Sequence, residues 1–166
     1  MNEDAGELAG FLPYQLSVAS NAVSALIAER YRKRFGLKIA EWRVMAVLGD
    51  AELSAGHGAG PMTQRGLTAA TLMDKVAVNR AVKVLEVRGL IARVPNPEDG
   101  RSHLLALTGE GRAIHAEVMP LARATERELL ADLAPGEEVA LRRLLAGLRA
   151  RAMRLARSTG EGPEQG

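Results

Sequence analysis

The chain contains no cysteine, which excludes disulfide bonds, thiolate zinc sites and thiol-based redox chemistry. Aromatic residues make up only 3% of it, so the core must be built mainly from Leu, Val, Ala and Met. No apolar run approaches the roughly 18 residues of a membrane-spanning helix. The acidic start, MNEDAGELAG, lacks the basic and apolar regions of a secretory signal. We therefore expect a cytoplasmic protein that does not enter membranes.

Sequence signatures of the common enzyme classes are also missing. No GxSxG, HExxH, P-loop or dinucleotide-binding fingerprint occurs, and no acid–base constellation stands out. The three histidines, His57, His103 and His115, stand at unrelated spacings without a cysteine nearby, so a metal site is not expected. The sequence predicts a protein without catalytic residues or cofactors.

The length of 166 residues and the balanced composition are typical of one globular domain, which we expect to span residues 1–166. The polar, Gly-rich ends, residues 1–9 and 158–166, are predicted to be disordered. Long helical patterns are expected at 11–34, 39–49, 109–132 and 135–157. Pro120 is expected to bend the third of these helices, and the glycines of residues 54–61 predict a loop.

The central third of the chain has a different organisation. A short helix is predicted at 63–71 with Thr63 as its N-cap, and Met73-Asp74 forms a turn in which Asp74 can cap a second helix at 75–88. Gly89 follows where a C-cap glycine belongs, and two short strands are then predicted at 90–94 and 102–107. The order of helix, turn, helix and hairpin suits a helix in a DNA major groove beside a ribbon in the minor groove.

The helix at 75–88 has two distinct faces. Val78, Val82 and Leu85 recur at helical spacing and are predicted to face the core. The opposite face combines amide, cationic and small apolar groups, which match the chemistry of base edges and phosphates; it carries Val76, Ala77, Asn79, Arg80 and Lys83. Taken alone, this face could equally be the solvated basic face of an ordinary helix. Its context of turn, preceding helix and hairpin favours DNA.

Net charge is only +2, so the distribution of charge says more than the total. Six Lys or Arg lie between Lys75 and Arg101, against three acids, which fits a polyanionic partner. At the hairpin tip, Asp99 stands two residues before Arg101 and is expected to orient its guanidinium. An arginine suits a narrow minor groove. Asp-Gly is otherwise a common turn sequence and Arg101 an ordinary surface charge.

Several motifs together resemble the MarR family of winged-helix transcription regulators. The resemblance rests on Asp99-Gly-Arg101 followed by Leu107-Thr108, on Thr63-Gln64, on residues 72–75 and 85–90, and on Glu41-Trp42-Arg43-Val44. It covers about residues 11–157. It implies a mainly α fold with a winged helix-turn-helix at 39–108 and a small β-hairpin wing, flanked by dimerisation helices at 11–34 and 109–157. It also implies that Asp99 and Arg101 act in the wing and that the helix at 75–88 reads DNA; Thr63 is expected to be a further DNA contact.

The last helix carries a broad apolar face made of Leu141, Leu144, Leu145, Leu148, Ala152 and Leu155. A face of this size exceeds what a small helical core can bury, and it is typical of an interface. A two-fold homodimer would place two reading helices about 34 Å apart, one turn of a pseudo-palindromic operator.

Regulators that resemble this chain often bind small aromatic or phenolic anions between the dimer helices and the winged helix. Trp42 and His115 have suitable chemistry, and Ser17 and Asn21 belong to a polar stripe on the first helix. The alternative for Trp42 is a place in the core, and for the stripe it is close helix packing.

The sequence thus predicts a homodimeric, sequence-specific regulator of transcription that binds double-stranded DNA, a repressor released by a small ligand. The alternative is a winged-helix module that binds protein without specific DNA binding.

Overall fold

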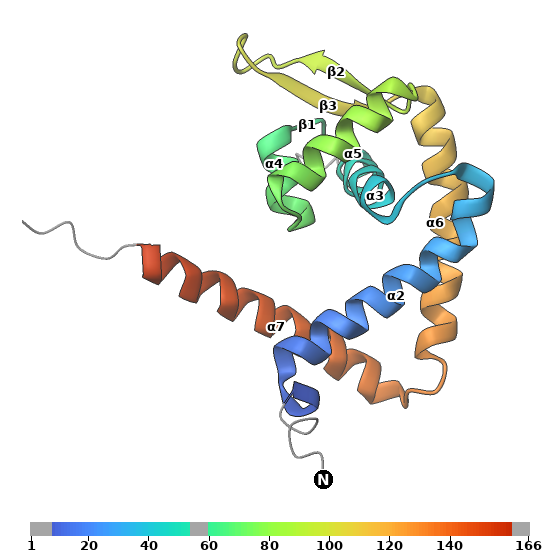
Figure 1. The fold of residues 1–166 in the computed structure, drawn as a ribbon, viewed down its shortest axis with the longest axis vertical. Coiled ribbons are helices and arrows are strands. Elements are labelled where there is room, and N and C mark those ends of the chain that lie inside the picture. The colour runs from blue at the N-terminus through green and yellow to red at the C-terminus, as the bar shows by residue number, and fades with distance from the viewer. Residues whose placement is uncertain (1–7, 54–59, 161–166) are drawn as a thin grey trace, which may run out of the picture. The chain divides into compact units, whose positions relative to one another are not determined.

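A computed structural model describes residues 8–53 and 60–160 (Figure 1). The chain divides into two compact units, Met1–Thr125 and Glu126–Gly166. Within the described residues, no helix is both long and apolar enough to cross a membrane.

The helices and strands follow the order that the sequence predicted. Their bounds are α2 (Leu12–Phe35), α3 (Ile39–Leu53), β1 (Met62–Thr63), α4 (Gln64–Thr71), α5 (Lys75–Val87), β2 (Ile91–Pro95), β3 (His103–Leu107), α6 (Gly109–Leu130) and α7 (Pro135–Gly160). Pro120 lies inside α6. The mainly α fold with a small wing is confirmed.

Four features differ from the expectation. Helix α3 continues to Leu53, and strand β1 was not predicted. Helix α7 continues to Gly160, and residues 8–9 are also helical, although both stretches were expected to be disordered. Each added residue of a helix gains a hydrogen bond, so polar residues can prolong a helix that is already formed. Residues 1–7, 54–59 and 161–166, which include most of the expected disorder, lie outside the described residues.

The N-termini of α4 and α5 and the C-terminus of α5 are fixed by the residues that the sequence indicated, whereas the C-cap of α4 is Leu72, which has φ 53°. The Thr63 hydroxyl accepts a hydrogen bond from the Gly66 N–H (3.1 Å), and the Asp74 carboxylate accepts one from the Ala77 N–H (2.8 Å). Each such cap contributes about 1 kcal/mol. Gly89 has φ 70° directly after α5, a conformation that glycine adopts without steric cost. These local contacts set where α4 and α5 begin and where α5 ends.

A three-stranded antiparallel sheet has the strand order β1-β3-β2. Thr63 pairs with Leu104, and Ile91 pairs with Leu107, so β3 is the central strand. Figure 1 shows the β2–β3 hairpin extending beyond α5. Beneath the sheet, a continuous core joins α3, α4 and α5; among its members are Met45, Leu48, Leu67, Val78, Val82, Leu85 and Leu105.

Arg88 fixes the end of α5 to the junction between α2 and α3. Its guanidinium donates hydrogen bonds to the carbonyl oxygens of Phe35 (2.6 Å) and Gly36 (3.2 Å). It also lies 3.8 Å from the buried carboxylate of Glu41, which accepts a hydrogen bond from the Lys38 N–H. Arg88 is therefore a structural residue.

Two helices leave apolar side chains exposed. In α2 only Ala28 and Tyr31 are buried, while Leu12, Leu16 and Val23 in its N-terminal half are exposed. None of the side chains described on α7 is buried, and its leucines are 40–55% exposed. The apolar pattern predicted for both helices is present, but the chain by itself does not cover it.

Candidate nucleic-acid interface and histidine pocket

The predicted facing of α5 agrees with the structure. Val78, Val82 and Leu85 are at most 1% exposed. On the opposite side Val76, Asn79, Arg80 and Lys83 are exposed, and Ala77 is half-buried. The helix is therefore held by one face and presents polar and cationic groups on the other. Whether these groups contact DNA remains a prediction.

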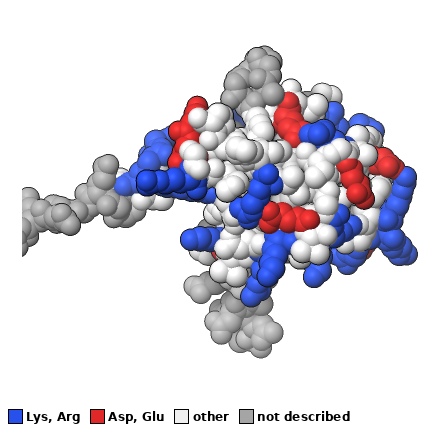
Figure 2. All heavy atoms as spheres, turned by 90° about the horizontal axis from the view of Figure 1, so that it is seen from above, with Lys and Arg blue, Asp and Glu red and all other residues white. Residues whose placement is uncertain are grey.

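The cations between Lys75 and Arg101 fall into two groups. Arg88 holds the α2–α3 junction, and Arg93 forms an ion pair with Glu86 at 2.7 Å. The other four form no ion pair with any residue that the structure describes; they are Lys75, Arg80, Lys83 and Arg101. Figure 2 shows Lys and Arg side chains interspersed with Asp and Glu over one whole face of the molecule. The outward face of α5 and the wing therefore carry cations that the described acids do not pair.

The tip of the wing is built by backbone contacts. The Asn96 side chain accepts a hydrogen bond from the Glu98 N–H (3.0 Å), and the Asp99 carboxylate accepts one from the Arg101 N–H (3.0 Å). The sequence predicts that Asp99 orients the guanidinium of Arg101. Instead its short side chain binds the backbone two residues on, as aspartate does in tight turns. Arg101 is exposed at a fixed position of the backbone.

Helix α4 contributes residues that the sequence reasoning missed. A hollow of about 650 Å³ lies between α4 and the start of α5, lined by Gln64, Arg65, Thr68, Ala69, Lys75 and Asn79. The Gln64 amide donates a hydrogen bond to the Asn79 Oδ1. Thr63, predicted as a DNA contact, is half-buried with its hydroxyl engaged in the cap. The sequence offered one indication of this role: Gln64 directly follows the N-cap Thr63 and so stands in the first turn of α4.

Trp42 and His115 are brought together by the fold. Their rings stack with centroids 5.6 Å apart. The centroid of the Tyr31 ring lies 5.7 Å from that of Trp42. Trp42 belongs to the hydrophobic core, so the core interpretation holds for it. Burial raises the pKa of Tyr31 to about 12, which keeps its phenol neutral. Ser17 and Asn21 are exposed on α2 and are not among the residues that line the pocket beside His115.

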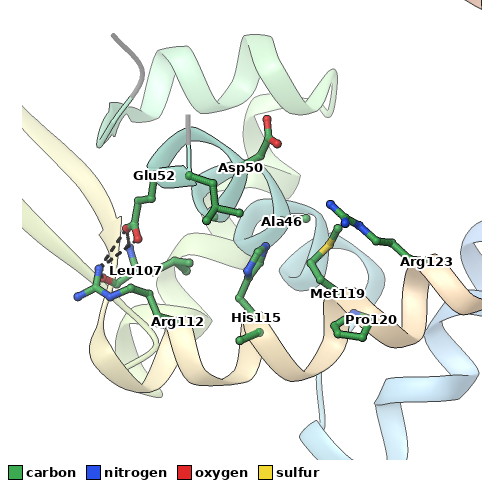
Figure 3. A pocket seen from close by; sticks show the side chains of 12 residues that line it. Ala46, Asp50, Glu52, Leu107, Arg112, His115, Met119, Pro120 and Arg123 are labelled. Atoms are coloured by element: carbon green, nitrogen blue, oxygen red, sulfur yellow. Dashed lines mark hydrogen bonds and ion pairs between the residues drawn. The ribbon is translucent and has the colours of Figure 1, made fainter. Parts of the chain in front are cut away.

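That pocket has a volume of about 500 Å³ and lies between α3 and α6. Figure 3 shows the His115 ring reaching from α6 toward α3, with Arg112 and Arg123 on either side of it along α6. Leu53, Leu107 and Met119 add apolar surface. The site thus combines an aromatic ring, two guanidinium groups and an apolar lining.

The imidazole of His115 is 8% exposed, and its Nε2 has no hydrogen-bond partner among the described residues. Burial lowers the pKa of His115, and the carboxylates of Glu52 and Asp50 oppose this shift only partly. Gly49 allows the ring to approach α3, because a Cβ at that position would lie 2.4 Å from Nε2. A neutral histidine with an unused ring nitrogen is therefore held at the pocket wall.

Glu52 connects this pocket to the wing. Its carboxylate accepts a hydrogen bond from the Leu107 N–H (3.0 Å) at the end of β3. The same carboxylate accepts one from the guanidinium of Arg112 (3.2 Å), which also donates to the Leu107 carbonyl (2.8 Å). A change at Arg112 can therefore reach the central strand of the sheet through one side chain.

Comparisons with known proteins agree with this arrangement. The sequence model of the MarR family matches residues 35–102. The HTH-type transcriptional repressor NicR of Pseudomonas putida is 34% identical over 86 residues, which are 52% of this chain and 54% of NicR. The match thus spans only about half of that relative.

Two solved structures extend the likeness over most of the chain. A MarR family transcriptional regulator from Silicibacter pomeroyi is 33% identical with a TM-score of 0.66, covering 85% of this chain and 97% of that one. Bordetella bronchiseptica BpsR, whose DNA binding is regulated by 6-hydroxynicotinic acid, is 26% identical with a TM-score of 0.71, covering 85% and 94%. The relatives are regulators and not enzymes, and the chain belongs to the MarR family of transcriptional regulators.

Proposed function

We propose that the protein is a homodimeric repressor that binds a pseudo-palindromic operator in double-stranded DNA and is released by a small aromatic acid. The observation that carries the proposal is the outward face of α5. Its apolar side is fully buried, while Asn79, Arg80 and Lys83 stand exposed. The two cations there have no described ion-pair partner, so folding leaves them available for another molecule.

The chemistry of this face suits a duplex. Arginine binds guanine O6 and N7, and valine packs against the thymine methyl in the major groove. Lys83 lies two turns further along α5 than Val76 and is suited to a phosphate. Arg101 at the wing tip is suited to the adjacent minor groove.

The exposed apolar faces of α2 and α7 support the homodimer. Leucines 40–55% exposed along α7 would remain in water in a single chain, and a second copy can cover them. Two-fold symmetry then presents two α5 helices to successive major grooves about 34 Å apart.

The pocket beside His115 supports the effector. Arg112 and Arg123 can attract a carboxylate, and the ring of His115, with the apolar side chains of Leu53 and Met119, offers a wall for an aromatic ring. An acid that binds Arg112 competes with Glu52, which also holds the Leu107 N–H. We propose that this competition changes the position of the wing and weakens DNA binding. BpsR, which is regulated by an aromatic acid, supports a ligand of this class.

Selection of bound duplexes from a random pool tests the DNA-binding part. We expect a palindromic consensus with half-sites one helical turn apart, and an affinity that falls steeply with salt. A pool without enrichment at any salt concentration would instead favour a winged-helix module that binds protein.

Titration of the protein–operator complex with 6-hydroxynicotinic acid tests the effector part. We expect release of DNA by the wild type and no release by Arg123→Ala. Arg127→Ala, one turn further along α6, is the matched control and should respond like the wild type. If all three proteins respond equally, the pocket between α3 and α6 is not the effector site.

A further inference from the structure

Asn79 on the outward face of α5 does not stand alone. The Nε2 of Gln64, the first residue of α4, donates a hydrogen bond to its Oδ1. Both partners have fixed backbones. Gln64 follows Thr63, which pairs with Leu104 of the central strand, and Asp74 caps α5. The amide pair therefore joins two rigid elements.

In this structure the bond turns the carbonyl end of the Asn79 amide toward α4. An unconstrained asparagine offers a carbonyl acceptor and an amino donor, and uses both when it binds adenine at N6 and N7. In this chain the carbonyl end is directed toward α4 by Gln64. The amino end, a donor only, is left for other partners.

Base edges differ in what they offer to a donor. In the major groove guanine presents two acceptors, N7 and O6, whereas adenine pairs its N7 acceptor with an N6 amino group. An amide that presents only its amino end to the base matches the guanine edge and leaves the adenine amino group without an acceptor.

We infer that Gln64 is a positioning residue that sets the hydrogen-bonding polarity of Asn79, so that Asn79 selects guanine rather than adenine. This inference rests on the proposed binding of α5 to DNA. Gln64 acts through Asn79 and has no base of its own. The fold does not depend on it, because the N-cap of α4 is the hydroxyl of Thr63.

Substitutions of Gln64 that differ in polarity test the inference. Bound sites are selected from random duplexes with the wild type, Asn79→Ala, Gln64→Ala and Gln64→Glu, each checked for folding by thermal unfolding. The wild type should enrich guanine at one position of each half-site, and Asn79→Ala should lose that preference. Gln64→Ala should lower the preference for guanine over adenine about tenfold at the same position.

Gln64→Glu provides the sharpest contrast. Its carboxylate accepts a hydrogen bond from the Asn79 amino group, which turns the carbonyl outward. The same position should then favour a base with an amino donor, adenine or cytosine. Preferences at the other positions should stay as in the wild type, although the added negative charge lowers affinity for every duplex.

Three outcomes would overturn the inference while leaving DNA binding intact. The Gln64 variants could change a different position from Asn79→Ala, they could change affinity without changing any base preference, or the wild type could enrich adenine where Asn79 acts. A wild-type protein that enriches no sequence contradicts the proposed function and the inference with it.

Discussion

Helices α5 and α7 both combine an apolar face with a cationic one, but the structure treats their apolar faces differently. On α5 the apolar face is buried within the chain, with Val78 and Leu85 at 0% exposure. On α7 the leucines stay exposed, and none of the side chains described on that helix is buried. The apolar face of α5 is thus packed within the chain and its cations are exposed, whereas the apolar face of α7 remains exposed to solvent. In our proposal α5 binds DNA and α7 binds a second copy.

The largest effect is expected from charges on the apolar face of α7. Leu144→Asp combined with Leu148→Asp should abolish the dimer, because paired carboxylates cannot be buried against leucines. Operator binding should fall about 100-fold or more, since one chain then holds only one half-site. Sedimentation and DNA titration measure both effects. Ala150→Asp, on the opposite face of α7, is the control and should remain dimeric.

The next largest effects come from removing one leucine side chain from each helix, which distinguishes a role in folding from a role in dimer formation. Leu85→Ala should lower the free energy of unfolding by about 2–5 kcal/mol, the usual result for a leucine removed from a packed core. Leu148→Ala removes the same atoms from α7 and should weaken the dimer more than it destabilises the chain. Urea denaturation at several protein concentrations distinguishes the two. If both variants lost the same free energy of unfolding at every protein concentration, the proposed difference between a core helix and a dimer helix would be wrong.

Arg80 and Arg88 lie eight residues apart and are expected to act in different ways. Arg80→Ala should relax discrimination at a particular base position, by about 1–3 kcal/mol. Arg88→Ala should cost about 1–3 kcal/mol of stability, because two carbonyl groups and the buried Glu41 lose their partner. Site selection and thermal unfolding measure the two effects. A shifted consensus in Arg88→Ala would refute its structural role.

Arg101 in the wing, like the cations of α5, is expected to contact DNA, whereas the arginines of α7 are not. Arg101→Ala should weaken binding to all duplexes alike and lower the salt slope by about one, as for the loss of one ionic contact. Arg154→Ala removes one arginine from α7 and should change neither quantity. Titrations at several salt concentrations test both variants. If Arg154→Ala lowered the slope as much, the arginines of α7 would also contact DNA.

The smallest effect concerns pH. Burial lowers the pKa of His115 below its usual 6.5, so acid protonates the unfolded chain first. The stability that this group contributes is complete above pH 6.5 and is lost as pH falls toward the folded-state pKa. Helix α7 contains no histidine, so its apolar face lacks this response. Thermal unfolding of His115→Asn, followed across pH 5–8, should depend less on pH than that of the wild type; an equal dependence would contradict the role of the buried ring.

The parts of the fold that the sequence predicted are those fixed by local contacts. Thr63, Asp74 and Gly89 act within a few residues of themselves, so spacing alone indicated where α4 and α5 begin and where α5 ends. The facing of α5 followed from its 3.6-residue period.

The parts that escaped prediction depend on distant partners. Arg88 binds carbonyl groups 52 and 53 residues earlier in the chain, which no local pattern reveals. Strand β1 has two residues and exists because β3 lies beside it. The stacking of Trp42 with His115 likewise joins residues of α3 and α6, so the composition of the pocket needed the folded chain.

The brief strand β1 has a consequence for how DNA geometry would be sensed. Through Thr63 and Leu104 it fastens the start of α4 to the strand that returns from the wing. The elements that make the major-groove and minor-groove contacts of the proposed complex therefore form one rigid unit. The distance between these two sets of contacts is fixed. Duplexes whose groove widths do not match that span would bind less tightly, even with every contacted base unchanged.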